Sequence, residues 1–546
     1  MSKRIERQKR IVILTMLFFL PVFVLLGRLF QLQILEGPQY ARIAVNQRSL
    51  RYDYKPTGRG QILDREGVSL LDSQWKPVTV FFEPILDGET REILSRHAET
   101  RPDQSVFAFG PESTINRELG DMPREGVISA LEQVRYGYNS LAPHVTGFVQ
   151  QATNNMSGLE RAFNDELSAG RPFSVAAIVD ARGNLVEGLG YRDWRGDDTG
   201  RPYSIITTID SHIQATVEQV LADADLSGAV VVMEPHSGDI LAMASYPDFK
   251  PRALYTGLEV QYDRENHLNK AIRPYEPGSV FKTVLTAAAL EENMASETYY
   301  CTGAIELSDD TSIRCYRGEA HGEVDLRQAL TVSCNVYFVW LGQKLGRETL
   351  QETAERFKLG SVTGIPLGEH AGQIPSPAQM PFLGDLGNAS IGQGKVQVTP
   401  LQITRMMATI INNGRDVYPR LVSEIIDSQG NTVREFRVYT GTQVIHPAVS
   451  RSLRSMLTDV VQSGTGTGSR IYSPDYLIAG KTGTAQATME GEPIEHSWFA
   501  GYAEPDGQPL VITVFLHGKD KPLYSGPGRD ATPATQIFRR ITDNLH

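Results

Sequence analysis

An uncharged, mostly aliphatic and aromatic segment at residues 11–27 constrains this chain more than any other feature of its sequence. The apolar character resumes after Arg28, so residues 11–30 supply the roughly 20 helical residues that cross a bilayer. Five lysines and arginines lie within residues 1–10. By the positive-inside rule they keep the N-terminus in the cytoplasm and export the chain that follows. We therefore expect a basic cytoplasmic tail at 1–10 and a transmembrane anchor at 11–30.

A cleaved signal peptide is the alternative interpretation of this segment. No pair of small residues of the A-x-A kind follows the apolar stretch, which is also long for a signal core. No later segment has the roughly 18 consecutive apolar residues of a second span. We favour one uncleaved helix, with the rest of the chain outside the membrane on a single tether.

The composition narrows the class of protein further. Hydrophobic residues make up 41% and charged residues 21% of the 546 residues, which excludes a disordered, collagen-like or polytopic membrane protein. The formal net charge of −11 argues against nucleic acid as a partner, because backbone binding needs a basic surface. Three cysteines exclude both a disulfide-dense scaffold and a zinc site of four thiolates.

The chain changes character near residue 204. Residues 37–203 are polar, with short β-like runs, glycine or proline breaks and little helical periodicity. Beyond them Asp210 is placed to cap a helix, and two buried strands at 229–233 and 240–244 form a hairpin. Strands at both ends with helices between them predict one antiparallel sheet packed by helices, an α+β domain at 204–546. The other expected elements are helices at 279–292, around 336–341 and around 537–541, and strands at 477–480, 498–502 and 510–516.

Ser279 precedes Lys282 by three residues at the start of an apolar run with helical spacing. Positions i and i+3 meet on a helix, so the two side chains are expected to lie together. A neutral amine there can accept the serine proton as the hydroxyl attacks a carbonyl, provided that burial or a neighbouring cation lowers the lysine pKa. The same spacing recurs at Ser73 and Lys76, where Pro77 disfavours helix, so we expect that copy to be accidental.

Two further patterns, Ser333-Cys334-Asn335 and the Lys-Thr-Gly-Thr segment at 481–484, each occur once downstream. The segment at 481–484 offers a charge and two hydroxyls to a carboxylate, and its glycine removes a side chain where the backbone must come close. Read alone, the first pattern is a polar helix cap and the second carries a solvated surface lysine. Their order behind the serine–lysine pair favours a shared site.

Together the three patterns resemble the S-x-x-K, S-x-N and K-T-G set of penicillin-binding proteins and serine β-lactamases. Further segments resemble class B penicillin-binding proteins of the penicillin-binding protein 2 and FtsI type, so that the resemblance covers nearly the whole chain. These segments are Arg59-Gly60-Gln61-Ile62-Leu63-Asp64-Arg65, Arg135-Tyr136, His144-Val145-Thr146-Gly147, Gly158-Leu159-Glu160, His321-Gly322, Gly392-Gln393-Gly394, Thr399-Pro400 and Gly464-Thr465-Gly466.

The resemblance implies a peptidoglycan D,D-transpeptidase that cross-links stem peptides with loss of the terminal D-alanine and that is a target of β-lactams. Ser279 would be the acylated nucleophile, with Lys282 as its general base. Ser333 and Asn335 would relay protons and contact the substrate amide. Lys481 would complete the catalytic set.

The resemblance also implies how the substrate is held. Lys481, Thr482 and Thr484 would bind the terminal carboxylate of the D-alanyl-D-alanine stem peptide, next to Gly483. The backbone N–H groups of Ser279 and Thr484 would form the oxyanion hole.

The same resemblance implies an elongated, mostly β pedestal domain at 37–203 and a transpeptidase domain at 204–546. The protein would sit in the bacterial cytoplasmic membrane by one helix, with its catalytic domain outside. A separate membrane glycosyltransferase of the SEDS type would supply glycan strands and contact the anchor and pedestal. We expect no cofactor, no metal ion and no nucleic acid.

Two alternatives to the transpeptidase remain. A serine β-lactamase needs no permanent anchor or preceding domain, and no E-x-x-L-N-like deacylation site follows Asn335. A catalytically silent cell-wall scaffold would keep the fold without turnover, but Ser279, Lys282 and Lys481 are all present.

Cys301 and Cys315 flank a short polar stretch, and outside the cytoplasm they could pair. A disulfide that closes a loop of this length would raise the free energy of unfolding by on the order of 3 kcal/mol. Two reduced thiols are the alternative, and we expect Cys334 to pack beside the site.

Overall fold

The chain divides into two compact units. Unit 1 contains Met1–Gly58, Trp75–Val134 and Gly170–Gly200, and unit 2 contains Arg59–Gln74, Arg135–Ala169 and Arg201–His546. Two segments from before residue 204 thus belong to unit 2, and the domain boundaries expected from the sequence stay predictions. The computed structural model describes residues 2–37, 39–40, 49–50, 59–96, 106–110, 113–119, 124–150, 155–168, 174–178, 185, 191–194, 202–256, 265–489, 492–518 and 533–546.

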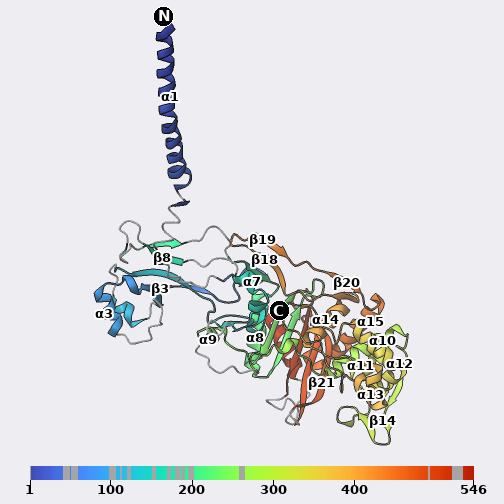
Figure 1. The fold of residues 1–546 in the computed structure, drawn as a ribbon. Coiled ribbons are helices and arrows are strands. Elements are labelled where there is room, and N and C mark those ends of the chain that lie inside the picture. Colours follow the sequence, from blue (N-terminus) through green and yellow to red (C-terminus); the bar gives the residue numbers. More distant parts are fainter. Residues whose placement is uncertain are drawn as a thin grey trace. The chain divides into compact units, whose positions relative to one another are not determined.

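The N-terminal apolar segment is one long helix, α1 (Ser2–Phe30), which continues into a π-helical turn, η1 (Gln31–Leu35) (Figure 1). Within the described ranges, Ile5–Leu35 is the one helix that is long and apolar enough to cross a membrane, and an 18-residue window within it has a mean hydropathy of 2.4. The prediction of a single apolar helix at this end of the chain is confirmed.

Unit 1 is built on a three-stranded sheet in the order β4-β3-β5. Side chains of β3 alternate between two small cores: Val80 and Phe82 pack in one and Phe81 in the other. The short helices here escaped the periodicity analysis because none is much longer than two turns. The elements are β1 (Ser49–Leu50), β3 (Gln74–Phe82), η2 (Glu83–Ile85), α3 (Gly88–Arg96), β4 (Val106–Phe109), α4 (Thr114–Leu119), β5 (Val127–Val134), β8 (Ser174–Ile178) and β9 (Tyr191–Trp194).

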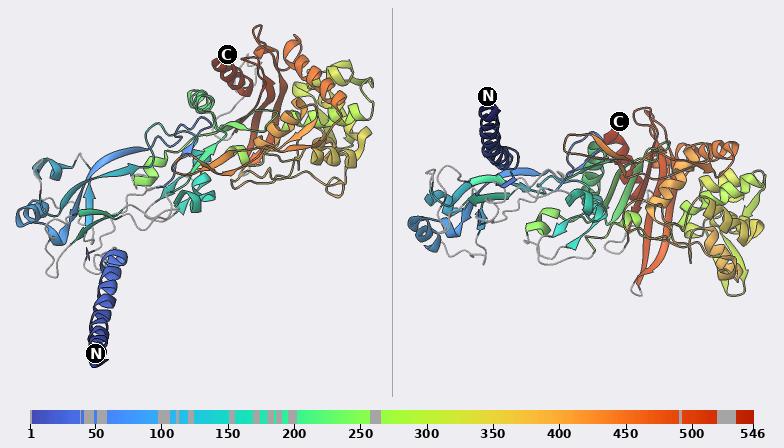
Figure 2. Two further views of the ribbon diagram at one scale, coloured as in Figure 1. Left: turned by 90° about the horizontal axis from the view of Figure 1, so that it is seen from above. Right: turned by 45° about the horizontal axis from the view of Figure 1, so that its top comes forward.

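Unit 2 contains the antiparallel five-stranded sheet that the sequence predicts, in the order β12-β11-β23-β22-β21 (Figures 1 and 2). The hairpin expected at 229–233 and 240–244 is present, and β11 also pairs with β23, so strands that are distant in the sequence meet in one sheet. The strands are β11 (Gly228–Met233), β12 (Ile240–Tyr246), β21 (Ile478–Met489), β22 (Glu492–Ala503) and β23 (Leu510–Leu516).

Helices cover both faces of this sheet. On β11, Val230 and Val232 pack with α8 (Ser211–Ala224) and α16 (Pro533–Leu545), whereas Val231 faces the opposite core. This period of two shows a strand that is buried on both sides. The predicted N-cap is confirmed, because Asp210 accepts hydrogen bonds from backbone amides at the start of α8.

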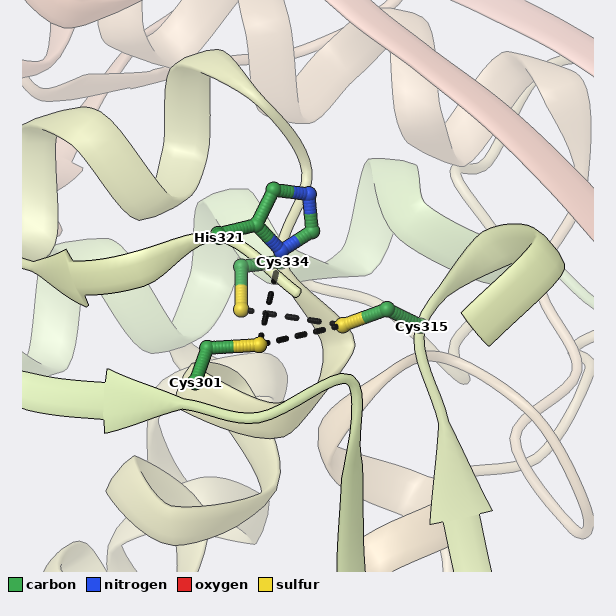
Figure 3. Close-up of side chains that lie close together, drawn as sticks. All are labelled: Cys301, Cys315, His321 and Cys334. Carbon is green, nitrogen blue, oxygen red and sulfur yellow. Dashed lines mark hydrogen bonds between the residues drawn. The ribbon is translucent and has the colours of Figure 1, made fainter. Parts of the chain in front are cut away.

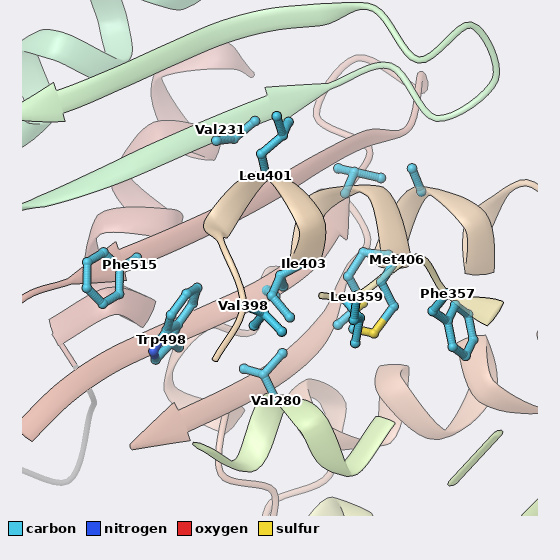
Figure 4. Close-up of a cluster of buried hydrophobic side chains, with 14 of the residues drawn as sticks. Val231, Val280, Phe357, Leu359, Val398, Leu401, Ile403, Met406, Trp498 and Phe515 are labelled. Atoms are coloured by element: carbon cyan, nitrogen blue, oxygen red, sulfur yellow. The ribbon is translucent and has the colours of Figure 1, made fainter. Parts of the chain in front are cut away.

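Two buried helices fill the second face. All twelve residues of α14 (Pro400–Ile411) are buried, as a helix that is surrounded by protein requires. Most of α10 (Lys282–Glu291) is buried too. Figure 4 shows Val280, which lies just before α10, in the same cluster as Ile403 of α14 and Trp498 of β22. The start of α10 is therefore anchored against the sheet.

The remaining elements of unit 2 surround this core. A second sheet has the order β19-β18-β10-β2, in which β10 and β2 are parallel. The other elements are β2 (Ile62–Leu63), α5 (Pro143–Thr146), β6 (Val149–Gln150), β7 (Asn155–Met156), α6 (Gly158–Ala162), α7 (Asn164–Ser168), β10 (Ser204–Thr207), α9 (Pro251–Thr256), η3 (Lys270–Ile272), η4 (Gly278–Phe281), β13 (Tyr299–Cys301), β14 (Ala304–Ser308), β15 (Thr311–Arg314), η5 (Tyr316–Gly318), β16 (Gly322–Val324), α11 (Leu326–Thr331), α12 (Asn335–Arg356), η6 (Pro377–Gln379), α13 (Leu383–Ser390), β17 (Arg415–Val417), β18 (Val422–Ile426), β19 (Thr432–Glu435), β20 (Thr440–Gln443), α15 (Pro447–Gln462) and η7 (Ser469–Ile471).

A buried ionic network joins three of the upstream segments singled out in the sequence. Glu160 has no exposed surface and accepts hydrogen bonds from Arg135, Tyr136 and Arg59. Arg135 is equally buried and also donates to the carbonyl oxygen of Gly60 at 2.9 Å. One carboxylate therefore neutralises two guanidinium groups inside the protein.

We expect Glu160→Gln to lower the free energy of unfolding by about 3–5 kcal/mol, because it leaves buried guanidinium charge without a counter-ion. Urea denaturation followed by tryptophan fluorescence measures the change. Glu66→Gln is the matched control, since its carboxylate is 78% exposed and 3.9 Å from Arg65 and surface pairs contribute about 0–1 kcal/mol. Equal stability of the two variants would contradict a stabilising role for the network.

Candidate active site

Ser279 and Lys282 lie on consecutive helical turns of different pitch. Ser279 belongs to η4, a 3₁₀ turn, and Lys282 is the first residue of α10. Residues three apart eclipse one another in a 3₁₀ turn, so the two side chains share a face. The sequence predicted one helix from residue 279, and the structure differs by making its first turn 3₁₀. Ser279 is half-buried, whereas Lys282 has no exposed surface.

The Lys282 amine binds the second motif. Its Nζ donates to the carbonyl oxygen of Ser333 at 2.8 Å, to Ser333 Oγ at 3.2 Å and to Asn335 Oδ1 at 2.6 Å. The Asn335 amide in turn donates to the carbonyl oxygen of Arg314 at 2.8 Å. Two motifs that are about 50 residues apart are thus joined by direct hydrogen bonds.

The second motif sits in the turn between α11 and α12. Ser333 has a left-handed backbone, with φ of 58°, which costs a non-glycine residue about 1–3 kcal/mol and is held only by its surroundings. Cys334 is the N-cap of α12, and its Sγ accepts a hydrogen bond from the Tyr337 amide. The alternative interpretation of this motif read alone was a helix cap by Ser333 or Asn335, but the thiol of Cys334 takes that place. Both polar side chains therefore remain available to the lysines.

The third motif lies within β21, the last strand of the sheet. The sequence predicted a strand that ends at Gly480, but pairing with β22 continues through residues 481–489. Lys481 is fully buried, and its Nζ donates to Ser333 Oγ at 2.9 Å and to the Thr482 carbonyl oxygen at 3.0 Å. Thr482 Oγ1 lies 2.7 Å from Thr467 Oγ1, which follows the Gly464-Thr465-Gly466 segment.

Ser333 Oγ thus lies between two buried amines. Burial lowers the pKa of Lys282 to about 8, against an opposing effect of the thiols of Cys334 and Cys315. Burial and the charge of Lys282 hold the pKa of Lys481 well below its usual range. Two ammonium ions that share one hydroxyl disfavour each other, so this arrangement favours one neutral amine near neutral pH.

Glycines allow β21 to lie directly on η4. A Cβ on Gly278 would be 2.5 Å from the carbonyl oxygen of Thr484, and one on Gly483 would be 2.8 Å from the carbonyl oxygen of Pro277. Gly392 closes the other side, because its Cβ would be 2.2 Å from the carbonyl oxygen of Gly278. The backbone that carries Ser279 therefore packs directly against the backbone of Thr484.

The sequence analysis missed Glu276, three residues before Ser279. Its carboxylate accepts a hydrogen bond from Gln397 at 3.0 Å, and its carbonyl oxygen accepts one from Trp498 Nε1 at 2.9 Å. A cleft of about 660 Å³ lies beside it, along the end of the β21–β22 hairpin. Glu276 belongs to none of the sequence motifs, so only its position three residues before Ser279 could have identified it as a candidate. The cleft is lined by Glu276, Gly394, Gln486, Ala487, Pro493, Ile494 and Glu495.

The second serine–lysine spacing is not a helix. Lys76 lies in β3, and Ser73 Oγ donates to Gln61 Oε1 at 2.8 Å. The prediction that Pro77 disfavours helix at this copy is confirmed.

The three cysteines are separate thiols in this structure (Figure 3). Cys301 Sγ lies 3.7 Å from Cys315 Sγ, well beyond the roughly 2.05 Å of a disulfide bond. Cys334 packs beside the site, as the sequence suggested, with its Sγ 3.8 Å from Cys315 Sγ.

Comparisons of sequence show which proteins this chain is similar to. Residues 228–543 match the family described as the penicillin binding protein transpeptidase domain. Stage V sporulation protein D of Bacillus subtilis is 30% identical, over 95% of this chain and 83% of its own length. The peptidoglycan D,D-transpeptidase MrdA of Acinetobacter baumannii is 27% identical, over 99% of this chain and 88% of its own length.

Solved structures share the fold. Penicillin binding protein 3 of Mycobacterium tuberculosis, complexed with aztreonam, superposes with a TM-score of 0.65 at 25% identity, over 90% of this chain and 96% of that one. A second solved structure superposes with a TM-score of 0.70 at 24% identity, over 98% of both chains. It is described as the structural coordination of polymerization and crosslinking by a peptidoglycan synthase complex.

Proposed function

Because this chain belongs to the penicillin-binding protein transpeptidase family, we propose that it cross-links peptidoglycan stem peptides through an acyl-enzyme on Ser279. The observation that carries the proposal is the hydrogen-bonded set in which Ser333 Oγ lies between the amines of Lys282 and Lys481. Three distant stretches of chain converge there around the turn that bears Ser279.

In the acylation step, neutral Lys282 takes the proton of Ser279 Oγ as that oxygen attacks the penultimate D-alanyl carbonyl carbon. The new bond is an ester from Oγ, and the C–N bond to the terminal D-alanine breaks. The lysine proton then passes through Ser333 Oγ to the departing amine. The short contacts from Lys282 to Ser333 Oγ and from there to Lys481 support this route.

The substrate is held along β21. Lys481, Thr482 and Thr484 offer an amine and two hydroxyls to the terminal carboxylate, and an extended peptide can lie beside the last strand of a sheet. The backbone N–H groups of Ser279 and Thr484 would donate to the oxyanion, an arrangement worth about 2.7–4 kcal/mol per donor in related chemistry. The close packing of Gly278 on Thr484 supports this pairing.

In the second step, the amine of another stem peptide attacks the ester carbonyl. Lys282 takes a proton from that amine, the C–O bond to Ser279 breaks, and the hydroxyl is restored. The net reaction exchanges one peptide bond for another and releases D-alanine. No metal ion or cofactor takes part in this scheme.

The acylation rate should rise with pH, because only the neutral form of Lys282 accepts a proton. With a Lys282 pKa of about 8, the rate should fall by about tenfold per pH unit below that value and level off above it. Stopped-flow measurement of β-lactam acylation between about pH 6 and 9 checks this. A flat profile across that range would count against Lys282 as the base.

Mass spectrometry of the full-length protein in detergent tests the proposal as a whole. Incubation with a β-lactam should add one antibiotic mass to the tryptic peptide that contains Ser279. Incubation with a D-alanyl-D-alanine stem peptide and an acceptor amine should release D-alanine and form the cross-linked product. A protein that takes up no antibiotic and releases no D-alanine would be a silent scaffold, and rapid antibiotic hydrolysis without a lasting adduct would indicate a β-lactamase.

Location and partners follow from the same proposal. The basic residues in the first turns of α1 would place the N-terminus in the cytoplasm and unit 2 outside the membrane. A structural neighbour comes from a peptidoglycan synthase complex that couples polymerization to crosslinking. We therefore propose a membrane glycosyltransferase of the SEDS type as the partner that supplies glycan strands, contacted through the anchor and the 37–203 pedestal.

A further inference from the structure

The cleft beside Glu276 takes no part in the proposed acylation step. It starts at Glu276, three residues before Ser279, and continues along β21 past Thr484, where Gln486 lines it together with residues 493–495 of β22. We call the space that these residues line the hairpin cleft. Strand residues are about 3.3 Å apart, so Gln486 lies about 7 Å along the strand from Thr484. A volume of about 660 Å³ holds a short peptide segment next to the nucleophile.

Two carboxylates give the hairpin cleft its charge. Glu276 and Glu495 both line it and are both half-buried. Glu276 accepts its hydrogen bond from the uncharged amide of Gln397 at 3.0 Å. Within the part of the chain that the structure describes, no lysine or arginine lines the cleft or forms an ion pair with either carboxylate. The cleft therefore presents negative charge that the surrounding protein does not neutralise.

The basic side chain that faces Glu276 is uncharged as well. His496 Nε2 lies 3.9 Å from Glu276 Oε2, which is too far for a hydrogen bond. Burial, together with the neighbouring His517, lowers the pKa of His496 to about 3. Its Nδ1 is buried without a hydrogen-bond partner among the described atoms. The imidazole is neutral at neutral pH, so the charge of Glu276 is left for a ligand in the cleft.

We infer that the hairpin cleft binds the acceptor peptide of the cross-linking reaction, and that Glu276 and Glu495 recognise its side-chain ammonium group. This inference rests on the proposed function, in which an amine of a second peptide attacks the Ser279 ester. A primary amine of this kind is protonated in water, so the acceptor reaches the protein as a cation. Half-buried carboxylates without a cationic partner attract such a group strongly, because water screens them less than exposed ones.

The protons of the second step then balance. The bound ammonium group loses two protons when it becomes the amide of the cross-link. One passes through Lys282 to Ser279 Oγ as the C–O bond of the ester breaks, and the other leaves to water. The cleft supplies the position and the charge for the ammonium form, and it takes no proton itself.

β21 would carry the two substrate sites one after the other. The amine and hydroxyls of residues 481–484 meet the carboxylate of the donor peptide, and the cleft with Glu276 and Glu495 follows beyond them. Its negative charge repels a donor that ends in a carboxylate and attracts a cationic acceptor. Charge therefore directs the two peptides to different sides of the ester.

Binding to the full-length Ser279→Ala protein in detergent tests the cleft without turnover. The probe is an N-acetylated tripeptide amide with one free lysine side-chain amine, and its matched partner carries acetyl-lysine at the same place. Saturation-transfer NMR should show that the lysine peptide binds about tenfold more tightly, as expected for a hydrogen-bonded charge pair. Adding Glu276→Gln and Glu495→Gln together should abolish that difference.

Turnover measurements then test the role of the cleft in the reaction. Glu495→Gln should raise the KM for an acceptor peptide about tenfold. The rate of β-lactam acylation should stay within about twofold of the native rate, because no acceptor takes part in that step. Glu492→Gln is the matched control: it removes an exposed carboxylate of the same hairpin that does not line the cleft, and should change neither quantity.

Two results would overturn the acceptor site. One is equal binding of the lysine and acetyl-lysine peptides. The other is a rise in acceptor KM in Glu492→Gln that matches the rise in Glu495→Gln, since charge anywhere on the hairpin would then have the same effect. If the lysine peptide binds in the cleft but the native protein takes up no β-lactam and releases no D-alanine, the proposed function fails while the site for a cationic peptide stands.

Discussion

Replacing Ser279 by alanine is expected to abolish covalent labelling of the full-length protein by fluorescent penicillin. The proposed acyl-enzyme is an ester on Ser279 Oγ, and alanine offers no atom for that bond. The surrounding hydrogen bonds of Lys282, Ser333 and Lys481 do not involve the Ser279 side chain, so the fold should persist. Gel fluorescence measures the labelling, and the unfolding temperature shows that the variant is folded.

The chain contains its own matched control for this experiment. Ser73 has the same spacing to a lysine, is also partly buried, and lies before a strand instead of a helix. Ser73→Ala should therefore label as the native protein does. If Ser279→Ala is labelled at the native level, Ser279 is not the nucleophile. If Ser73→Ala loses its labelling, the nucleophile is Ser73 instead.

Replacing Lys282 by methionine should slow acylation by about 10²–10⁴-fold, the usual contribution of a general base. Lys282→Arg should be as slow, because a guanidinium keeps the charge but cannot lose its proton. A plot of the residual acylation rate of Lys282→Met against pH should also lack the inflection near the Lys282 pKa of about 8. If Lys282 had only a structural role, its replacement would leave that inflection in place. Stopped-flow acylation as a function of pH measures both effects.

Lys270 provides the control for these lysine variants. It is 3% exposed and lies in η3, and its Nζ donates to the carbonyl oxygen of Glu265 at 3.4 Å. Lys270→Met should retain both the native rate and its pH inflection. A Lys282→Met variant that acylates at the native rate would assign the base to another group.

The parts of unit 2 that the sequence predicts well are those whose pattern is local. The β11–β12 and β22–β23 hairpins follow from buried runs separated by turn residues, and Asp210 is a cap that needs only its own helix. The pairing of β11 with β23 is different, because nothing near either strand specifies a partner so distant in the chain. Tertiary packing decides it.

In the candidate site, too, local motifs were predictable from the sequence and tertiary contacts were not. Short motifs identify Ser279, Lys282, Ser333 and Lys481 in the sequence. They do not predict that Ser333 Oγ lies between two amines, because that position depends on the turn between α11 and α12. The sequence analysis did not predict that β21 extends through residues 481–489. Glycine and polar residues there give no strand pattern, and the strand forms because this segment pairs with β22. His321 was noted only as part of a motif, since its relation to the thiols appears once the hairpins fold.

The strand order of unit 2 has a consequence for how the protein is made. β11 is synthesised well before its neighbour β23, because Gly228 lies opposite Leu516. Until β23 is made, one edge of β11 lacks its partner and is exposed to mispairing with other strands. A chain that stops before residue 510 would lack that strand, so the antibiotic labelling that we propose should be absent from such a truncated chain.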